Sequence, residues 1–248
     1  MQVETTADML SWQHPSTPQL ISSGVLLPGT RMILFGKAGI GKSMAAMDLA
    51  FQLSVGGDWM GLQCCQCSVM VVQVEVPKAE FQVRLAKYVC ANALVPDDSL
   101  TWATEPYFKI SAAGHLGQLK AVMDKHKPQV LILDPIYKMI AGDISKNDNV
   151  QRLLDDLDLI QAKHNTALVL IGHTRKLNTS VPLDMVVWED ELIGGKFFIN
   201  WCDTAVVMLP DSKRDRFVMD FRKVRHAATI VPTTTVWFDR STLRYRVV

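Results

Sequence analysis

The residues most able to do chemistry in this sequence form one short run. They are Gly36, Lys37, Ala38, Gly39, Ile40, Gly41, Lys42 and Ser43. The run matches G-x-x-x-x-G-K-S, the pattern of a phosphate-binding loop. Its glycines let backbone N–H groups turn toward an anion, and the following helix adds the partial positive charge of its N-terminus. Lys42 can then reach the β- and γ-phosphates of ATP, while the Ser43 hydroxyl coordinates Mg²⁺. We expect these residues and Met44, the next along the chain, to contact the nucleotide.

The residues on either side have the pattern that such a loop needs. Residues 32–35 are a short apolar run typical of a buried strand, and residues 44–53 have the pattern of an amphipathic helix. The alternative is a Gly-rich turn that matches by chance, but such a turn needs neither the strand before it nor the helix after it. The sequence therefore predicts a nucleotide site between a strand and a helix.

Two further apolar runs end in acidic residues. Residues 68–76 are rich in β-branched side chains, predict a buried strand and carry Glu75 near its end. Residues 129–133 predict another buried strand, and Asp134 follows directly. In P-loop ATPases an Asp at this point, the Walker B position, holds Mg²⁺ directly or through water. Ser43 and Asp134 are therefore the predicted metal ligands.

Pro135 occupies the position after Asp134, where many P-loop ATPases carry a catalytic Glu. Hydrolysis needs a group that orients the attacking water, so this carboxylate must come from another strand end. Between the two motifs, Glu75 is the only acidic residue that ends a buried run. We therefore expect Glu75 to be the catalytic carboxylate. The alternative is a strand-end Glu that only faces water.

His173 follows a further predicted strand, residues 167–171. An imidazole there could hydrogen-bond the γ-phosphate and report its loss, so His173 joins Lys42 and Glu75 among the predicted catalytic residues. A polar strand-end His is the alternative. A long loop follows and begins with Arg175 and Lys176. Loops of this length are usually functional or disordered rather than simple connectors.

The last part of the chain predicts antiparallel β structure. Lys223 and Arg225 lie in an extended segment there and alternate onto one face. The sequence offers them no local ligand, so they are candidates to reach a phosphate, and a solvated strand end is the alternative. The other predicted elements are strands over residues 203–209, 216–221, 231–238 and 243–248, helices over 78–91, 116–126 and 150–164, and a short strand over 107–110.

Composition restricts the class of protein. The 248 residues suit one α/β domain of the larger kind, and the formal net charge of +1 argues against a broadly basic nucleic-acid binder. Five cysteines, an odd number, with no secretory signal predict a reducing, cytoplasmic location. No apolar run approaches the roughly 18 residues of a membrane span. Cys64, Cys65 and Cys67 have no second Cys/His pair nearby, so we expect free thiols rather than a zinc site.

Residues 1–20 predict an arm that leads into a domain of residues 21–248. Met9, Leu10 and Trp12 could form an apolar anchor on this arm. The anchor could dock on the chain's own core or on a neighbouring subunit, and docking on its own core is the simpler expectation.

The order of these parts resembles the RecA-like ATPases, specifically the hexameric replicative helicase branch with its DnaB-type and plasmid RepA-type motors. The likeness covers roughly residues 20–248. The sequence carries Gly195 where DnaB-type motors favour Ser, and we expect no N-terminal primase-binding domain, as in RepA-type motors. The resembling features are the P-loop, Glu75, Leu133-Asp134 without a following Glu, His173, Gly194-Gly195 before Asp203, and Lys223-x-Arg225.

The resemblance implies both a fold and a mechanism. The fold is α/β, with a mostly parallel central sheet flanked by helices and a C-terminal antiparallel β extension. Glu75 would activate water, and Lys223 and Arg225 would enter the ATP site of the adjacent subunit. The loops at residues 137–149 and 174–193 would face single-stranded DNA in the channel of a hexameric ring.

The sequence therefore favours an ATP-hydrolysing, homo-oligomeric motor on single-stranded DNA, in its most specific form a ring-forming replicative-type helicase. Two alternatives stay open. One is a recombination or annealing ATPase, and the other is a regulatory ATPase that cycles its oligomeric state without unwinding. A small-molecule P-loop kinase is disfavoured, because it needs an acceptor pocket and an Arg-rich lid, whereas this chain ends in antiparallel β structure.

Overall fold

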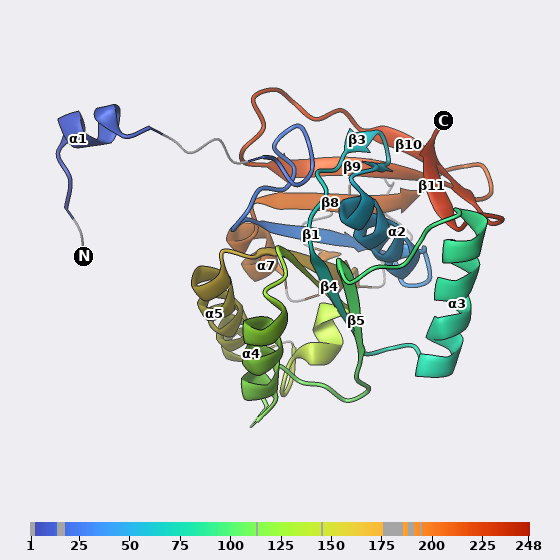
Figure 1. The fold of residues 1–248 in the computed structure, drawn as a ribbon, viewed down its shortest axis with the longest axis horizontal. Coiled ribbons are helices and arrows are strands. Elements are labelled where there is room, and N and C mark those ends of the chain that lie inside the picture. Colours follow the sequence, from blue (N-terminus) through green and yellow to red (C-terminus); the bar gives the residue numbers. More distant parts are fainter. Residues whose placement is uncertain are drawn as a thin grey trace.

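A nine-stranded sheet runs through the part of the chain that the computed structural model describes, which is residues 3–13, 18–112, 114–144, 146–175, 186–187, 191–193 and 195–248. The strand order is β11-β10-β9-β8-β1-β7-β6-β4-β5 (Figure 1). Neighbours from β5 across to β8 are parallel, and β8 to β11 are antiparallel. The bounds are β1 Arg31–Gly36, β4 Val69–Gln73, β5 Leu100–Thr104, β6 Val130–Asp134, β7 Ala167–His173, β8 Thr204–Pro210, β9 Arg216–Val224, β10 Thr234–Asp239 and β11 Arg244–Val247. The predicted fold class is confirmed.

Helices cover both faces of this sheet. Side chains alternate along β1, so that Met32 and Leu34 pack toward α2 while Ile33 and Phe35 pack toward α4, α5 and α7. A small hairpin of β2 and β3 adds to the α2 side, and α3 lies at the edge beside α2 (Figure 1). The bounds are α2 Lys42–Val55, α3 Lys78–Ala91, α4 His115–His126, α5 Asn147–His164, α7 Lys196–Trp201, β2 Asp58–Trp59, β3 Leu62–Gln63 and the 3₁₀ turn η1 Ile136–Met139. The helices predicted over 78–91, 116–126 and 150–164 are α3, α4 and α5.

The strand predicted over residues 107–110 is wrong. Tyr107 has a positive φ of 72°, and the Ile110 N–H donates to the Met139 carbonyl (2.8 Å) instead of joining a ladder. The strand of this region is β5, which pairs with β4 at the edge of the sheet. Every residue of β5 is only half-buried, so it lacks the apolar run that marks an inner strand.

The N-terminal arm carries a short helix, α1 (Thr6–Ser11), that lies away from the sheet in Figure 1. None of its residues is buried. Leu10 is 83% exposed, Met9 56% and Trp12 59%. The expectation that these apolar side chains dock on the chain's own core is therefore wrong for the single chain. Docking on a neighbouring subunit stays a prediction.

A buried carboxylate ties the C-terminal extension to the P-loop helix. Asp48 of α2 is fully buried and accepts hydrogen bonds from the Tyr88 hydroxyl (2.6 Å) and Gln52 Nε2 (3.3 Å). From β11, the Tyr245 backbone N–H donates to it (3.1 Å), and Arg244 Nε lies 3.5 Å away. Burial raises the pKa of Asp48, and these partners oppose the rise. One side chain thus joins the last strand to the helix that follows the P-loop.

Asp48→Ala should lower the free energy of unfolding by about 3–5 kcal/mol, because it removes one partner from a buried ionic and hydrogen-bonded group. Equilibrium unfolding in urea measures the change. Asp98→Ala, at an exposed position, is the matched control and should change stability by no more than about 0.5 kcal/mol. Equal losses in the two variants would contradict the role assigned to Asp48.

Candidate nucleotide and catalytic site

The phosphate loop lies between the end of β1 at Gly36 and the start of α2 at Lys42. A Cβ on Gly36 would clash with the Met208 carbonyl oxygen, and one on Gly41 would lie 2.5 Å from the Tyr245 hydroxyl. Gly41 also has a φ of 105°, a conformation that favours glycine. The Tyr245 hydroxyl donates to the Gly41 carbonyl (3.0 Å), so the last strand directly supports the loop.

The Lys42 ammonium is held inside the loop by hydrogen bonds to backbone carbonyls. Its side chain is buried, and Nζ donates to the carbonyls of Gly36 (2.9 Å) and Lys37 (2.8 Å). Burial lowers the pKa of Lys42 to about 8, while Asp134 and Glu75 oppose the change. The group is still mainly an ammonium at neutral pH. Its hydrogen bonds go to neutral carbonyls, which phosphate oxygens can replace with a gain in attraction.

Asp134 ends β6 beside this ammonium. Burial raises the pKa of Asp134 to about 6; the Ser43 hydroxyl and Lys42 oppose the rise, and Glu75 adds to it. The buried Oδ1 of Asp134 has no hydrogen-bond partner among the described residues. An unpartnered carboxylate oxygen next to a hydroxyl is the donor set that Mg²⁺ takes at nucleotide sites, where phosphates and water complete the shell.

Ser43 and Asp134 therefore fit the predicted Mg²⁺. In the described part of the chain no cluster of three or more His, Cys, Asp or Glu side chains could hold a metal by itself. This agrees with an ion held partly by the nucleotide. The five cysteines are free thiols, and Cys64 and Cys67 are buried.

Glu75 follows β4 by two residues, at the same sheet edge as Asp134. Gln73, the last residue of β4, pairs with Asp134 in the sheet. The Gln73 side chain fixes the turn that carries Glu75, because its Oε1 accepts the N–H groups of Glu75 (3.2 Å) and Val76 (2.9 Å). The Glu75 carboxylate is exposed and forms an ion pair with Lys138 Nζ of η1 (3.1 Å).

His173 ends β7 directly opposite Gly36 in the parallel pair β1–β7. Its ring packs edge-on against Tyr137, with centroids 4.9 Å apart. Burial lowers the pKa of His173 to about 4, with Lys42 and Lys138 adding to the effect and Glu75 opposing it. The imidazole is therefore neutral at physiological pH and can donate one hydrogen bond toward the loop.

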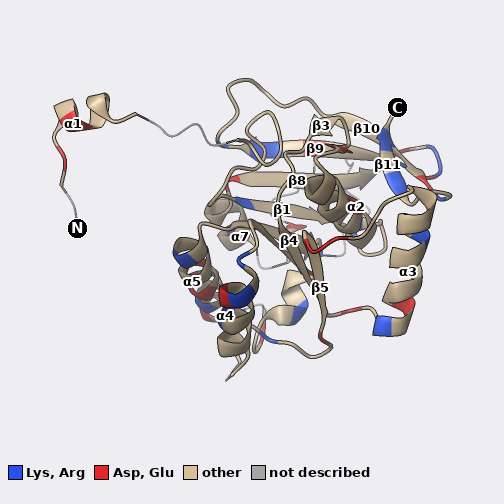
Figure 2. Cartoon of the chain, in the orientation of Figure 1, with Lys and Arg blue, Asp and Glu red and all other residues tan. Residues whose placement is uncertain are grey.

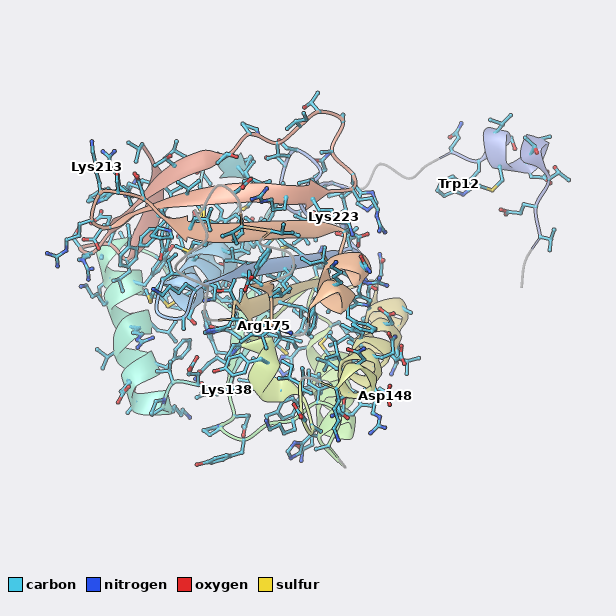
Figure 3. The ribbon with its side chains drawn as sticks, turned by 180° about the vertical axis from the view of Figure 1, so that it is seen from behind. Trp12, Lys138, Asp148, Arg175, Lys213 and Lys223 are labelled. Atoms are coloured by element: carbon cyan, nitrogen blue, oxygen red, sulfur yellow. The ribbon has the colours of Figure 1, made fainter. Side chains whose placement is uncertain are left out.

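Lys223 and Arg225 lie at the other ends of the strands, away from the P-loop. Val224 pairs with the first residue of β8, whereas the P-loop lies at the other end of β1. Lys223 Nζ donates to the carbonyls of Ile199 (2.8 Å) and Cys202 (2.5 Å) at the end of α7 (Figure 3). Arg225 Nη1 contacts Asp203 Oδ1 at 2.9 Å.

The sequence-based premise that these two cations have no local ligand is therefore wrong. Their partners come from residues distant in sequence and were invisible in the pattern. The structure also excludes both cations from their own chain's P-loop. A role at the site of another subunit stays a prediction.

Sequence reasoning missed four contributors to the site. Gln73 supports the turn that carries Glu75, and Tyr245 supports the P-loop; no sequence motif indicates either contact. Tyr137 and Lys138 fall inside the predicted DNA-facing loop 137–149, but the structure turns them toward His173 and Glu75. The available signal was that they lie only three and four residues after Asp134.

Lys176 and most of the loop 174–193 lie outside the described residues. Arg175 is described and directly follows Thr174, whose N–H donates to the Gly36 carbonyl (3.1 Å).

A phosphate loop between β1 and α2, with an acidic strand end two strands away in a sheet of this order, defines a RecA-like P-loop ATPase. The chain belongs to the AAA domain family AAA_25, whose model matches residues 2–179. No match was found among the curated proteins. No helix in the described residues is long and apolar enough to cross a membrane.

Solved structures with the same fold come from several kinds of protein. Flagellar accessory protein FlaH from Methanocaldococcus jannaschii is 16% identical, with a TM-score of 0.60 over 89% of each chain. The KaiC-like protein PH0186 from Pyrococcus horikoshii OT3 is 12% identical, with a TM-score of 0.64 over 92% of this chain and 93% of that one. The RadB recombinase is 16% identical, with a TM-score of 0.61 over 89% of this chain and 91% of that one. At these identities the likeness shows the fold alone. None of the three is named as a helicase.

Protonation of Asp134 should weaken Mg²⁺ binding in mildly acid solution. Since the pKa of Asp134 is about 6, its carboxyl is ionised above that pH and must lose a proton to bind Mg²⁺ below it. The Mg²⁺ dissociation constant of the nucleotide complex should rise by up to about tenfold per pH unit below that pKa, measured by calorimetric titration.

Asp134→Asn is the matched control, because its curve shows only the titration of the nucleotide phosphates. The difference between the two curves is the part due to Asp134. Parallel curves for the parent and Asp134→Asn would contradict the assignment.

Proposed function

We propose that this ATPase is an oligomeric motor that hydrolyses ATP on single-stranded DNA. The observation that supports it best is that four side chains meet at the carboxyl ends of the parallel strands: Lys42, Asp134, Glu75 and His173. The charges of Lys42 and Glu75 influence the pKa values of the neighbouring groups in this set. Lys42 would hold the β- and γ-phosphates, and the Glu75 carboxylate would orient the attacking water and take its proton. Neutral His173 would donate a hydrogen bond to the γ-phosphate. Mg²⁺ on Ser43 and Asp134 would supply further positive charge to the phosphate oxygens.

Single-stranded DNA is the proposed partner because the long loop after β7 begins with basic residues, at the end of the sheet that carries the P-loop. Arg175 follows the end of β7 by two residues, and Lys176 comes next in the sequence. Elsewhere acidic and basic side chains share the same helices, α3, α4 and α5 (Figure 2), so a broad basic surface does not provide the contact. Ring-forming helicase action is the narrower form of this proposal. The fold shared with a recombinase suits the broader form, and the likeness to a flagellar accessory protein and a KaiC-like protein keeps a regulatory ATPase as the alternative.

Single-stranded DNA should raise the rate of ATP turnover by the parent chain. Arg175→Ala should weaken DNA affinity and lower the slope of log affinity against log salt by about 0.7, the value for one phosphate contact on a single strand. Steady-state ATPase assays and fluorescence anisotropy at several salt concentrations measure the two effects. Lys125→Ala, exposed near the end of α4, is the control. A parent chain that turns over ATP but ignores DNA would support the regulatory alternative.

Arg225 is the proposed finger residue that acts on the neighbouring subunit. A ring of identical chains uses a head-to-tail contact, so one edge of a subunit faces a different edge of the next. The Arg225 side chain is 52% exposed and needs only to leave Asp203 to reach an approaching phosphate. Lys223 is less suited to this role, because its ammonium is held by the carbonyls that end α7.

Mixing two inactive variants tests this arrangement. Arg225→Ala should bind ATP almost normally and hydrolyse it slowly, since a finger residue contributes roughly 10³ to 10⁵ in rate. Glu75→Gln should bind ATP and lose turnover. Mixed assemblies contain interfaces where one subunit brings an intact Glu75 and its neighbour an intact Arg225, so part of the ATPase rate should return. No recovery in mixtures that demonstrably form hetero-oligomers would refute the trans assignment.

A further inference from the structure

The proposed catalytic carboxylate has a cationic partner within its own chain. Lys138 Nζ lies 3.1 Å from Glu75 Oε1, and both side chains are partly exposed, at 38% and 41%. The pair bridges the ends of the adjacent strands β4 and β6. While Lys138 Nζ contacts Oε1, that oxygen is engaged by the ammonium and is not free to accept a hydrogen bond from the attacking water. This contact therefore opposes the role of Glu75 for as long as it persists.

Lys138 is also close to where the last phosphate of ATP would lie. It follows Tyr137, whose ring packs on His173, and His173 pairs with Gly36 at the start of the P-loop. Lys42 and Lys138 both influence the His173 imidazole, one from α2 and the other from η1. The two lysines thus approach the same region from different sides, and the side chain of Lys138 is the more exposed.

We propose that Lys138 binds the γ-phosphate of ATP in its own subunit and leaves Glu75 to do so. A terminal phosphate carries more negative charge than a carboxylate and offers three acceptor oxygens, so it competes well for an ammonium. One side-chain movement would then free the carboxylate and add positive charge where the phosphate needs it. ADP has no γ-phosphate and leaves the Lys138–Glu75 pair intact. This inference rests on the proposed ATPase function of the site.

The test compares two nucleotides on one set of variants. Dissociation constants for ATPγS and for ADP, each with Mg²⁺, are measured by calorimetry on the full chain. Lys138→Ala should weaken ATPγS by about tenfold, a typical loss for one charged hydrogen bond, and leave ADP within about twofold. Retained ADP binding also shows that the variant is folded. Lys146→Ala, an exposed lysine in the same loop region, should change neither value.

A double-mutant cycle with Glu75→Gln tests the exchange of partners. Because Glu75→Gln removes the ion pair that ATP must break, it should tighten ATPγS relative to ADP. In that background Lys138→Ala should cost more ATPγS affinity than it does in the parent. Additive effects of the two substitutions would mean that Lys138 does not exchange Glu75 for the phosphate, and would overturn the inference.

The remaining outcomes separate this inference from the function on which it rests. If the parent binds both nucleotides and Lys138→Ala weakens both equally, or neither, the γ-phosphate contact is wrong and the ATPase function stands. If the parent binds neither nucleotide, both proposals fail together.

Discussion

The parallel alignment of β1, β7, β6 and β4 is the constraint on which the site depends. Parallel strands place all their carboxyl ends at one edge of the sheet, so residues far apart in sequence meet there. The register sets the details, because Gly36 lies opposite His173 and Gln73 opposite Asp134. A shift of one residue in either pair would exchange the side chains on the two faces of the strand and separate these partners. The same packing that buries the core therefore fixes the positions of the functional groups.

Lys42 and Asp134 are both buried at the carboxyl ends of these strands, and they do not form an ion pair with each other. Burial lowers the pKa of Lys42 to about 8 and raises that of Asp134 to about 6, so each group is pushed toward its neutral form. Phosphates bring negative charge to Lys42, and Mg²⁺ brings positive charge to Asp134. A nucleotide with its metal would relieve both costs at once, and any ligand that binds only the folded chain also stabilises it. The two pKa shifts are thus complementary to the charges of the ligand that the P-loop motif predicts.

The C-terminal strands do more than extend the sheet. The Tyr245 hydroxyl contacts Gly41 of the P-loop, and the Tyr245 backbone N–H binds Asp48 of the following helix. At the end of β9, the Lys223 ammonium donates to the Cys202 carbonyl after α7, and Arg225 contacts Asp203. The antiparallel extension therefore contacts the nucleotide edge at one end and presents a cation at the opposite edge. An assembly in which neighbouring chains meet edge to edge would connect these two ends.

The sequence alone determined the parts of this protein that depend on neighbouring residues. The P-loop from Gly36 to Ser43 is a local device, and Asp134 was recognisable because an apolar run leads directly into it. Long, regular apolar patterns likewise predicted most helices and strands, since burial on a sheet imposes those periods. The edge strand β5 escaped prediction because its half-buried residues show no such pattern. Tertiary structure decided the partners of the charged groups: Lys138 on Glu75, carbonyls on Lys223, Asp203 on Arg225, and Tyr245 on the P-loop. These contacts join segments tens to hundreds of residues apart, and only the packing of the whole chain brings them within hydrogen-bonding distance.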